Sequence, residues 1–100
     1  MNKKLEALFL SEVEEYIKKL SEPMQAKIAA NISILESGDF QTPYTKQLKQ
    51  TIRELIVGQH RFIYFKKKQI LYFVHAFRKQ TAKTPKNKID NAMNIYKNIK

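Results

Sequence analysis

The chain contains no cysteine, and it has only two histidines, two glycines and three prolines among its 100 residues. The absence of cysteine excludes disulfide bonds, cysteine nucleophiles and thiolate metal sites. His60 and His75 lie fifteen positions apart, which is not the ligand spacing of a zinc site. With 43% hydrophobic residues and so little Gly and Pro, the composition predicts a globular protein rather than a disordered one.

Long hydrophobic runs are also missing. No apolar stretch approaches the roughly 18 residues that a membrane-spanning helix needs. The N-terminal segment has two early lysines but no small-residue cleavage site, so it does not have the pattern of a signal peptide. We therefore expect a cytoplasmic protein without a membrane partner, and the length predicts one domain over residues 1–100.

Acidic residues are scarce in the second part of the chain. Residues 1–57 hold eight Lys and Arg against eight acids, whereas residues 58–100 hold eleven against Asp90 alone, so this part carries the whole net charge of +10. Such a basic segment predicts a polyanionic partner, most simply a nucleic acid. Because a divalent metal site needs several carboxylates, any RNA cleavage here should be independent of metal and of cofactors, by attack of a 2′-hydroxyl on its own phosphate.

The first forty residues predict a strand followed by two helices. Residues 5–10 form a short apolar run, and Ser11 with Glu14 has the pattern of an N-cap and its capping box. Apolar residues then recur at helical spacing up to Ser21-Glu22-Pro23, which should end one helix and begin the next. The second helix should end at Ser37-Gly38, which gives a helical hairpin.

The rest of the chain predicts a small sheet and a final helix. Residues 39–46 have no hydrophobic period and are expected to form a surface loop. Three strands are expected, over residues 51–57, 61–65 and 70–77. Gly58-Gln59 and Lys66-Lys67-Lys68-Gln69 are the expected turns of an antiparallel meander. A last helix should begin at Pro85 with Thr84 as its N-cap, so the fold class is α+β with the two N-terminal helices on one side of the sheet.

The candidate site lies where the last strand ends. Arg78, Lys79 and Lys83 follow the apolar run directly, and Lys86 and Lys88 occupy the first turn of the next helix. Cations are unfavourable at a helix N-terminus, so this arrangement favours a bound anion such as phosphate. A solvated basic face is the alternative.

Other charged and aromatic residues allow two interpretations each. Arg61, within a strand, could hold a phosphate through its guanidinium or form an ion pair with Glu54 on the adjacent strand. The lysines of the 66–69 turn are expected only to keep that turn soluble. The residues alone favour His75 as a hydrogen-bonded core histidine and His60 as a surface residue. Three tyrosines could stack on RNA bases or pack in the core, namely Tyr64, Tyr72 and Tyr96.

Three signatures in order resemble the HigB-type branch of the RelE/ParE toxin superfamily, in its phage Gp49-like group. They are Arg53-Glu54-Leu55, Arg61 with Tyr64-Phe65, and the run from His75 to Pro85, H-x-F-R-K-x-T-x-K-T-P. The resemblance extends over nearly the whole chain and implies a RelE-like fold. The chain departs from it at Ile56, where many members have a further arginine, and this leaves more of any phosphate contact to Arg61 and the loop.

The resemblance implies a toxin of a type II toxin–antitoxin system that cuts messenger RNA on the ribosome, and so a metal-independent endoribonuclease. The implied partners are the ribosome, mRNA and a helix-turn-helix, HigA-like antitoxin in a hetero-oligomer. The implied catalytic residues are Arg61, Arg78, Lys79 and Lys83. The implied RNA contacts are Arg53, Tyr64 and His75, and Lys86 and Lys88 are expected to contact RNA because of their place in the first turn of the last helix. A ParE-like inhibitor of DNA gyrase and a non-catalytic basic nucleic-acid-binding module remain as alternatives.

Overall fold

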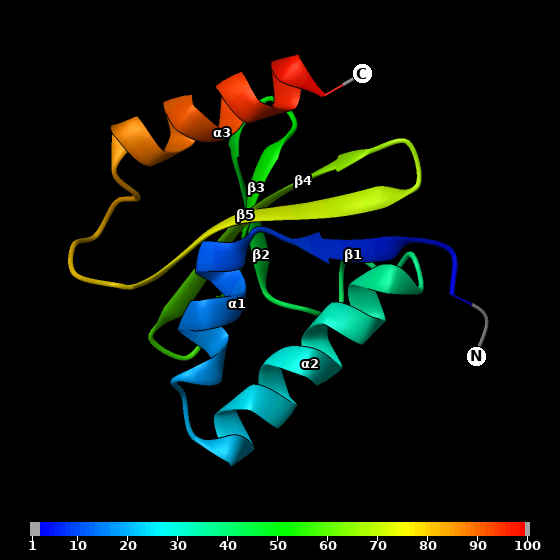
Figure 1. Ribbon diagram of the computed structural model, residues 1–100, viewed down its shortest axis with the longest axis vertical. Helices are drawn as coiled ribbons and strands as arrows, with labels where there is room; N and C mark the ends of the chain where they lie inside the picture. Colours follow the sequence, from blue (N-terminus) through cyan, green and yellow to red (C-terminus); the bar gives the residue numbers. More distant parts are fainter. Residues whose placement is uncertain (1–2, 100) are drawn as a thin grey trace.

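The computed structural model describes residues 3–99, which form three helices and a mixed sheet of five strands (Figure 1). The strands are β1 (Glu6–Phe9), β2 (Thr45–Lys49), β3 (Ile52–Val57), β4 (His60–Lys67) and β5 (Ile70–Arg78). The helices are α1 (Ser11–Lys18), α2 (Glu22–Glu36) and α3 (Lys86–Asn98). The predicted α+β class and the predicted order of helices and strands are confirmed.

The sheet order is β1-β5-β4-β3-β2. The predicted meander is present, because β3, β4 and β5 pair antiparallel through short turns. Two edge strands complete it: β1 joins β5 in parallel, and β2 pairs antiparallel with β3. The sequence prediction missed β2 and placed its first two residues in a loop, because Thr45–Lys49 is polar and largely exposed, as an edge strand can be.

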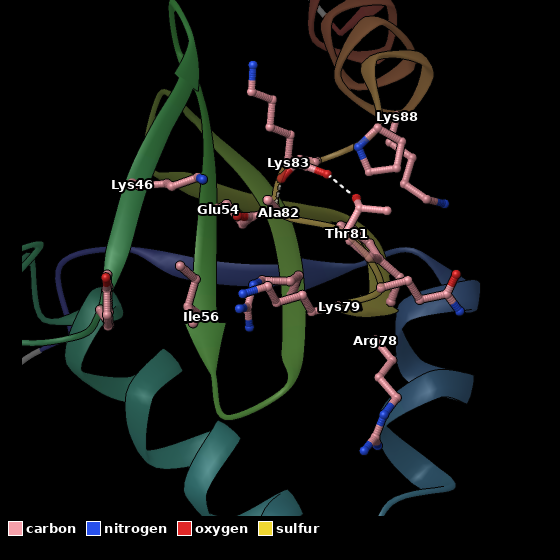
Figure 2. Close-up of a pocket in the computed structure, with 15 residues that line it drawn as sticks. Lys46, Glu54, Ile56, Arg78, Lys79, Thr81, Ala82, Lys83 and Lys88 are labelled. Carbon is pink, nitrogen blue, oxygen red and sulfur yellow. Dashed lines mark hydrogen bonds between the residues drawn. The ribbon is translucent and has the colours of Figure 1, made fainter.

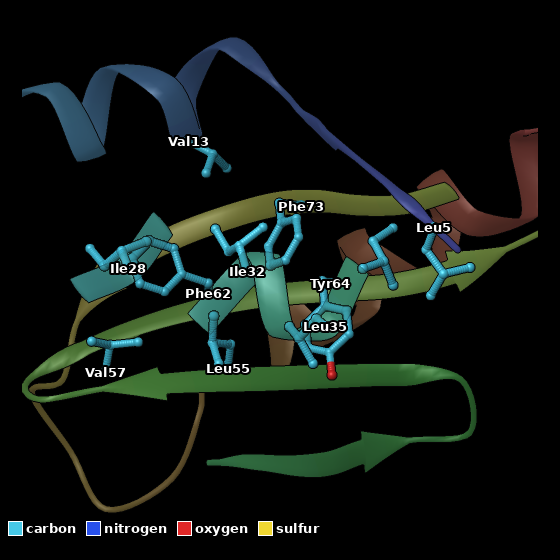
Figure 3. Close-up of a cluster of buried hydrophobic side chains, with 11 residues drawn as sticks. Leu5, Val13, Ile28, Ile32, Leu35, Leu55, Val57, Phe62, Tyr64 and Phe73 are labelled. Atoms are coloured by element: carbon cyan, nitrogen blue, oxygen red, sulfur yellow. The ribbon is translucent and has the colours of Figure 1, made fainter. Parts of the chain in front are cut away.

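The helices lie on both faces of the sheet. Apolar residues of α1 and α2 pack against one face, and Figure 3 shows this main core, with Val13, Ile28 and Leu35 facing the buried side chains of Phe62 and Tyr64. A smaller core on the other face lies under α3, which contributes Ala92 and Met93. Because strand residues alternate between faces, this division decides which charged strand residues can share a site.

A β-bulge in β5 changes the alternation. Ile63 of β4 pairs with His75 and Tyr64 pairs with Phe73, so Val74 has no partner of its own. The extra residue brings His75 to the α3 side of the sheet, where its Nε2 lies 2.9 Å from Asn91 Oδ1. Residues beyond the bulge continue the alternation from this new register up to Arg78.

Two predicted helix caps are wrong. The N-cap of α1 is Leu10 rather than Ser11, because Leu10 is still extended and its amide donates to Phe73 O of the sheet. The N-cap of α3 is Pro85, and neither cap residue makes a side-chain cap hydrogen bond. The predicted cap of α2 is confirmed, since Ser21 accepts a hydrogen bond from Met24 N.

Candidate functional site

A pocket of about 500 Å³ opens on the part of the α3 face that α3 does not cover (Figure 2). Its floor is formed by β2, β3 and β4, and the segment 79–85 between β5 and α3 forms one wall. Six cationic side chains line it: Lys46, Arg61, Arg78, Lys79, Lys83 and Lys88. Glu54 is the single carboxylate among the lining residues. The pocket therefore has a positive field with one negative group in its floor.

One row of residues crosses the pocket from strand to strand. Ile56 pairs with Arg61, and Arg61 pairs with Phe77, so their side chains lie at the same level on the same face. The row continues past the start of β2, where Ile56 N donates to Tyr44 O at 2.9 Å. All four side chains line the pocket.

Arg61 is held by main-chain carbonyl groups. Its Nη1 donates to Gly58 O at 2.9 Å and to His60 O at 3.2 Å. The turn that supplies these carbonyls requires the positive φ of Gly58, +60°. Within residues 3–99 no carboxylate forms an ion pair with Arg61, so the predicted alternative of a pair with Glu54 is wrong. Its guanidinium is half-buried and lines the pocket.

Glu54 instead fixes the loop that carries the lysines. Its side chain is 1% exposed, and Oε2 accepts a hydrogen bond from the hydroxyl group of Thr84 at 2.5 Å. This contact joins β3 to the segment 79–85 across thirty positions of sequence. It also explains the failed prediction at α3, because the Thr84 hydroxyl binds Glu54 rather than the helix N-terminus.

Two different hydrogen bonds hold the segment 79–85, the loop that carries Lys79 and Lys83. Lys79 N donates to Gln59 O at 2.7 Å, which holds the main chain of Lys79 against the β3–β4 turn. In Figure 2, the Lys79 side chain lies near the floor while Arg78 extends away along α1. At the far end, Thr81 Oγ1 donates to Lys83 O at 2.7 Å, which keeps the loop compact. The loop therefore presents Lys79 and Lys83 from a constrained backbone.

Arg78 lies close to Tyr16 and His60 on the α1 side of the sheet. The Tyr16 hydroxyl group lies 2.7 Å from His60 Nδ1. Burial raises the pKa of Tyr16, which the charge of Arg78 partly opposes. Burial, followed by the charges of Arg78 and Arg61, lowers the pKa of His60. The prediction that His60 is a surface residue is wrong, since it is 6% exposed.

Four residues predicted to contact RNA lie outside the pocket. Arg53 is on the opposite face of β3 from Glu54, and its Nη2 donates to Thr45 Oγ1. Tyr64 is completely buried in the main core, so the prediction that it stacks on a base is wrong. His75 lies between Asn91 and Glu12, with Nε2 hydrogen-bonded to Asn91 and the buried Nδ1 without a hydrogen-bond partner, so the alternative of a fully hydrogen-bonded core histidine is only partly met. Lys86 faces Asp90 at 3.3 Å in an exposed ion pair.

One lysine of the β4–β5 hairpin has a structural role that the sequence prediction missed. The Lys67 ammonium group donates to Tyr96 O at 2.8 Å and also to Ile99 O, and it lies 4.6 Å from the centre of the Tyr96 ring. It thereby binds the carbonyl groups at the C-terminal end of α3. Lys66 and Lys68 are exposed, as expected.

Among the lining residues that were not predicted as site residues are two on β2 or beside it and one on β3: Tyr44, Lys46 and Glu54. Tyr44 and Lys46 belong to the segment that was expected to be a loop, so their common face could not be recognised. Glu54 was considered as a partner of Arg61 and as part of the Arg53-Glu54-Leu55 signature, but not as a site residue. Once β2 is paired with β3 in register, Lys46 lies opposite Glu54 and Tyr44 lies beside Ile56.

Two further observations concern residues 3–99 alone. They contain no cluster of three or more potential metal-binding side chains of His, Cys, Asp or Glu. No helix in this part of the chain is long and apolar enough to cross a membrane.

The sequence profile of the family described as "Phage derived protein Gp49-like (DUF891)" matches residues 15–97. The chain belongs to this Gp49-like family. No curated protein matches its sequence significantly. The predicted Gp49-like membership is thus confirmed, and the match includes every residue that lines the pocket.

Two solved structures share the fold of this Gp49-like chain. One belongs to the archaeal RelE–RelB complex of Pyrococcus horikoshii OT3, with a TM-score of 0.68, 15% sequence identity, and coverage of 79% of this chain and 99% of the other. The second belongs to the RelB–RelE antitoxin–toxin complex of Methanococcus jannaschii, with a TM-score of 0.60, 14% identity, and coverage of 84% and 95%. The predicted RelE-like fold is confirmed.

Proposed function

We propose that this Gp49-like chain is the toxin of a type II toxin–antitoxin system and cuts messenger RNA on the ribosome. The observation that carries the proposal is the pocket itself, a hollow on one face of a RelE-like sheet that six cationic residues line. Such a site attracts a phosphodiester and stabilises the extra charge that develops on phosphorus during its cleavage. A HigB-type assignment, and a helix-turn-helix, HigA-like antitoxin as partner, are part of the same proposal.

The reaction that fits the pocket is an internal transesterification of RNA. The 2′-oxygen attacks the adjacent phosphorus, a new O2′–P bond forms, and the P–O5′ bond breaks. One group must accept the proton of the 2′-hydroxyl and another must give a proton to the departing 5′-oxygen. The products are a 2′,3′-cyclic phosphate and a 5′-hydroxyl, and no metal ion is required.

The proposed roles follow the geometry. Arg61 binds the non-bridging phosphate oxygens, because its guanidinium is fixed by carbonyl groups and cannot transfer protons at neutral pH. Lys79 and Lys83, on the anchored loop, exchange protons with the 2′- and 5′-oxygens. Arg78 and Lys88, at the edge of the pocket, bind the neighbouring phosphates of the strand. The ribosome contributes by holding the message in the in-line geometry.

Variants of the pocket test the proposal. Arg61→Ala and Lys79→Ala should each relieve growth arrest and lower message cleavage in a purified translation reaction by about 10²–10³-fold, since each removes a charge that stabilises the transition state. Lys68→Ala is the matched control, because it removes an exposed lysine of the hairpin turn and should leave cleavage unchanged. Equal losses at all three positions would show that bulk charge rather than the pocket is responsible. If DNA replication stops before protein synthesis, a gyrase inhibitor would be the correct assignment.

The ends of the products test the chemistry separately. A single 2′-deoxy substitution at the cut position should block cleavage, and the upstream fragment should end in a 2′,3′-cyclic phosphate. Naked RNA at high protein concentration should be cut slowly in the presence of EDTA. A 5′-phosphate on the downstream fragment would refute internal attack, even if translation is still inhibited.

A further inference from the structure

The pocket has an apolar side as well as a cationic side. Tyr44 is 70% exposed, the most exposed of the large hydrophobic residues in the described chain, and it lines the pocket beside Ile56. The cations Arg61 and Lys79 line the other side. An isolated exposed aromatic residue needs no explanation, but one at the rim of a basic pocket offers a ligand a second kind of contact.

The main chain of Tyr44 is fixed on both sides. Upstream, the side chain of Asp39 accepts hydrogen bonds from Gln41 N, Thr42 N and the Thr42 hydroxyl group, and these bonds lower the pKa of Asp39. Pro43, directly before Tyr44, is buried and has a fixed φ. Downstream, Tyr44 O accepts from Ile56 N. The ring is therefore exposed to solvent while its main chain is held in place. Binding a ligand would then cost little backbone entropy.

The two sides of the pocket lie two strands apart in the sheet. Tyr44 lies beside Ile56 of β3, and Ile56 pairs with Arg61 of β4, so two strand spacings of about 4.8 Å separate the backbones of Tyr44 and Arg61. Tyr44 and Arg61 are thus about 10 Å apart across the sheet. An aromatic ring on one side and a guanidinium group on the other suit a nucleotide of an RNA strand, whose planar base can stack on Tyr44 and whose anionic phosphodiester can bind Arg61.

We propose that Tyr44 is the base-stacking residue of this pocket and that it holds the nucleobase next to the cut phosphate of single-stranded RNA. This inference rests on the proposed function and adds the base subsite to it. Stacking on an aromatic ring tolerates every base, so Tyr44 should contribute affinity and positioning rather than a sequence preference. The pocket floor beside Tyr44 favours a base on Tyr44 and a phosphate on Arg61. Ile56 offers the base an apolar surface there, where an arginine would offer a second phosphate contact.

Binding of short RNA to the purified toxin tests the proposal directly. The probes are two uncleavable heptanucleotides with a 2′-deoxy central position, one with adenine at that position and one without a base. Base stacking on an aromatic residue changes Kd by roughly 5- to 100-fold. Wild type and Tyr44→Phe should each bind the adenine probe more tightly than the abasic probe by this factor. Tyr44→Leu should bind both probes equally, with the affinity that wild type has for the abasic one.

Two controls separate stacking from other effects. Leu8→Ala alters the other exposed large apolar residue, 42% exposed and outside the pocket, and should retain the difference between the probes. The ratio of the Kd values for the two probes should persist as the salt concentration is raised. The affinity for both probes should fall, because salt weakens the contacts to phosphate. Because the chain has no tryptophan, Tyr44→Trp also provides a single tryptophan, and excitation selective for tryptophan should show quenching by the adenine probe but not by the abasic probe.

The possible outcomes are distinct. If Tyr44→Leu still distinguishes the probes, or lowers affinity for both equally, Tyr44 is not the base subsite. If Tyr44→Leu leaves RNA binding intact but weakens neutralisation by the antitoxin, Tyr44 is a protein contact and the inference is wrong. If the probes are distinguished through Tyr44 but no message is cut, the base subsite stands and the nuclease proposal fails.

Discussion

Replacing Thr84 by valine removes the hydroxyl group that binds the buried carboxylate of Glu54. Valine has nearly the shape of threonine, so the change creates no cavity and isolates the hydrogen bond. Glu54 is 1% exposed, and water cannot replace the lost donor without opening the loop. We therefore expect the Thr84→Val variant to fold but to be clearly less stable than the wild type.

The magnitude follows from the kind of group involved. A hydrogen bond to a charged group contributes about 1.5–3 kcal/mol, and leaving a buried acceptor without its donor costs an amount in the same range. The free energy of unfolding of Thr84→Val should thus fall by about 2 kcal/mol. Glu54→Gln keeps an oxygen acceptor of similar shape and should cost less. Replacing both partners, by Glu54→Leu with Thr84→Val, should cost much less than the sum of the two single changes.

Urea unfolding followed by circular dichroism measures these differences. Thr81→Val is the matched control, because Thr81 is an exposed threonine of the same loop that donates only to Lys83 O. It should change stability by less than about 0.5 kcal/mol. A Thr84→Val variant as stable as Thr81→Val, or strictly additive effects of the two changes at Glu54 and Thr84, would refute the view that this pair anchors the loop.

Two further predictions concern residues away from the catalytic groups. Lys67→Ala should lower the free energy of unfolding by about 1 kcal/mol in a urea titration, because Lys67 binds the last carbonyl groups of α3, whereas Lys68→Ala should be neutral. Burial and the charges of Arg78 and Arg61 lower the folded-state pKa of His60, so its unfolded state binds more protons. The stability that neutral His60 contributes should be present above its unfolded pKa of about 6.5 and lost as the pH falls through the folded value. The loss of stability between pH 7.5 and pH 5 should therefore be smaller in His60→Gln than in the wild type, and equal losses would contradict this assignment.

The structure brings together only part of the predicted site. Arg61, Arg78, Lys79, Lys83 and Lys88 line the pocket as expected, because four of them follow or lie within strands whose apolar pattern is plain in the sequence. Arg53 was placed in the site through resemblance alone, and Tyr64 through resemblance and the possibility that a tyrosine stacks on a base. They pair with each other across β3 and β4 on the face that α1 and α2 cover, which no local pattern at these positions indicates.

The amino-acid sequence by itself determined the type and order of most helices and strands. It also determined which part of the chain carries the net positive charge. Hydrophobic periodicity specified both early helices and the meander, and the distribution of Lys and Arg specified the basic part. Only the tertiary structure decided which faces those charges share, because that depends on strand register, on the bulge at Val74 and on the pairing of the polar edge strand β2. The same pairing of β2 brings Tyr44 and Lys46 beside Ile56 and Glu54 in the pocket, and the polar sequence of β2 has no hydrophobic period that would indicate this register.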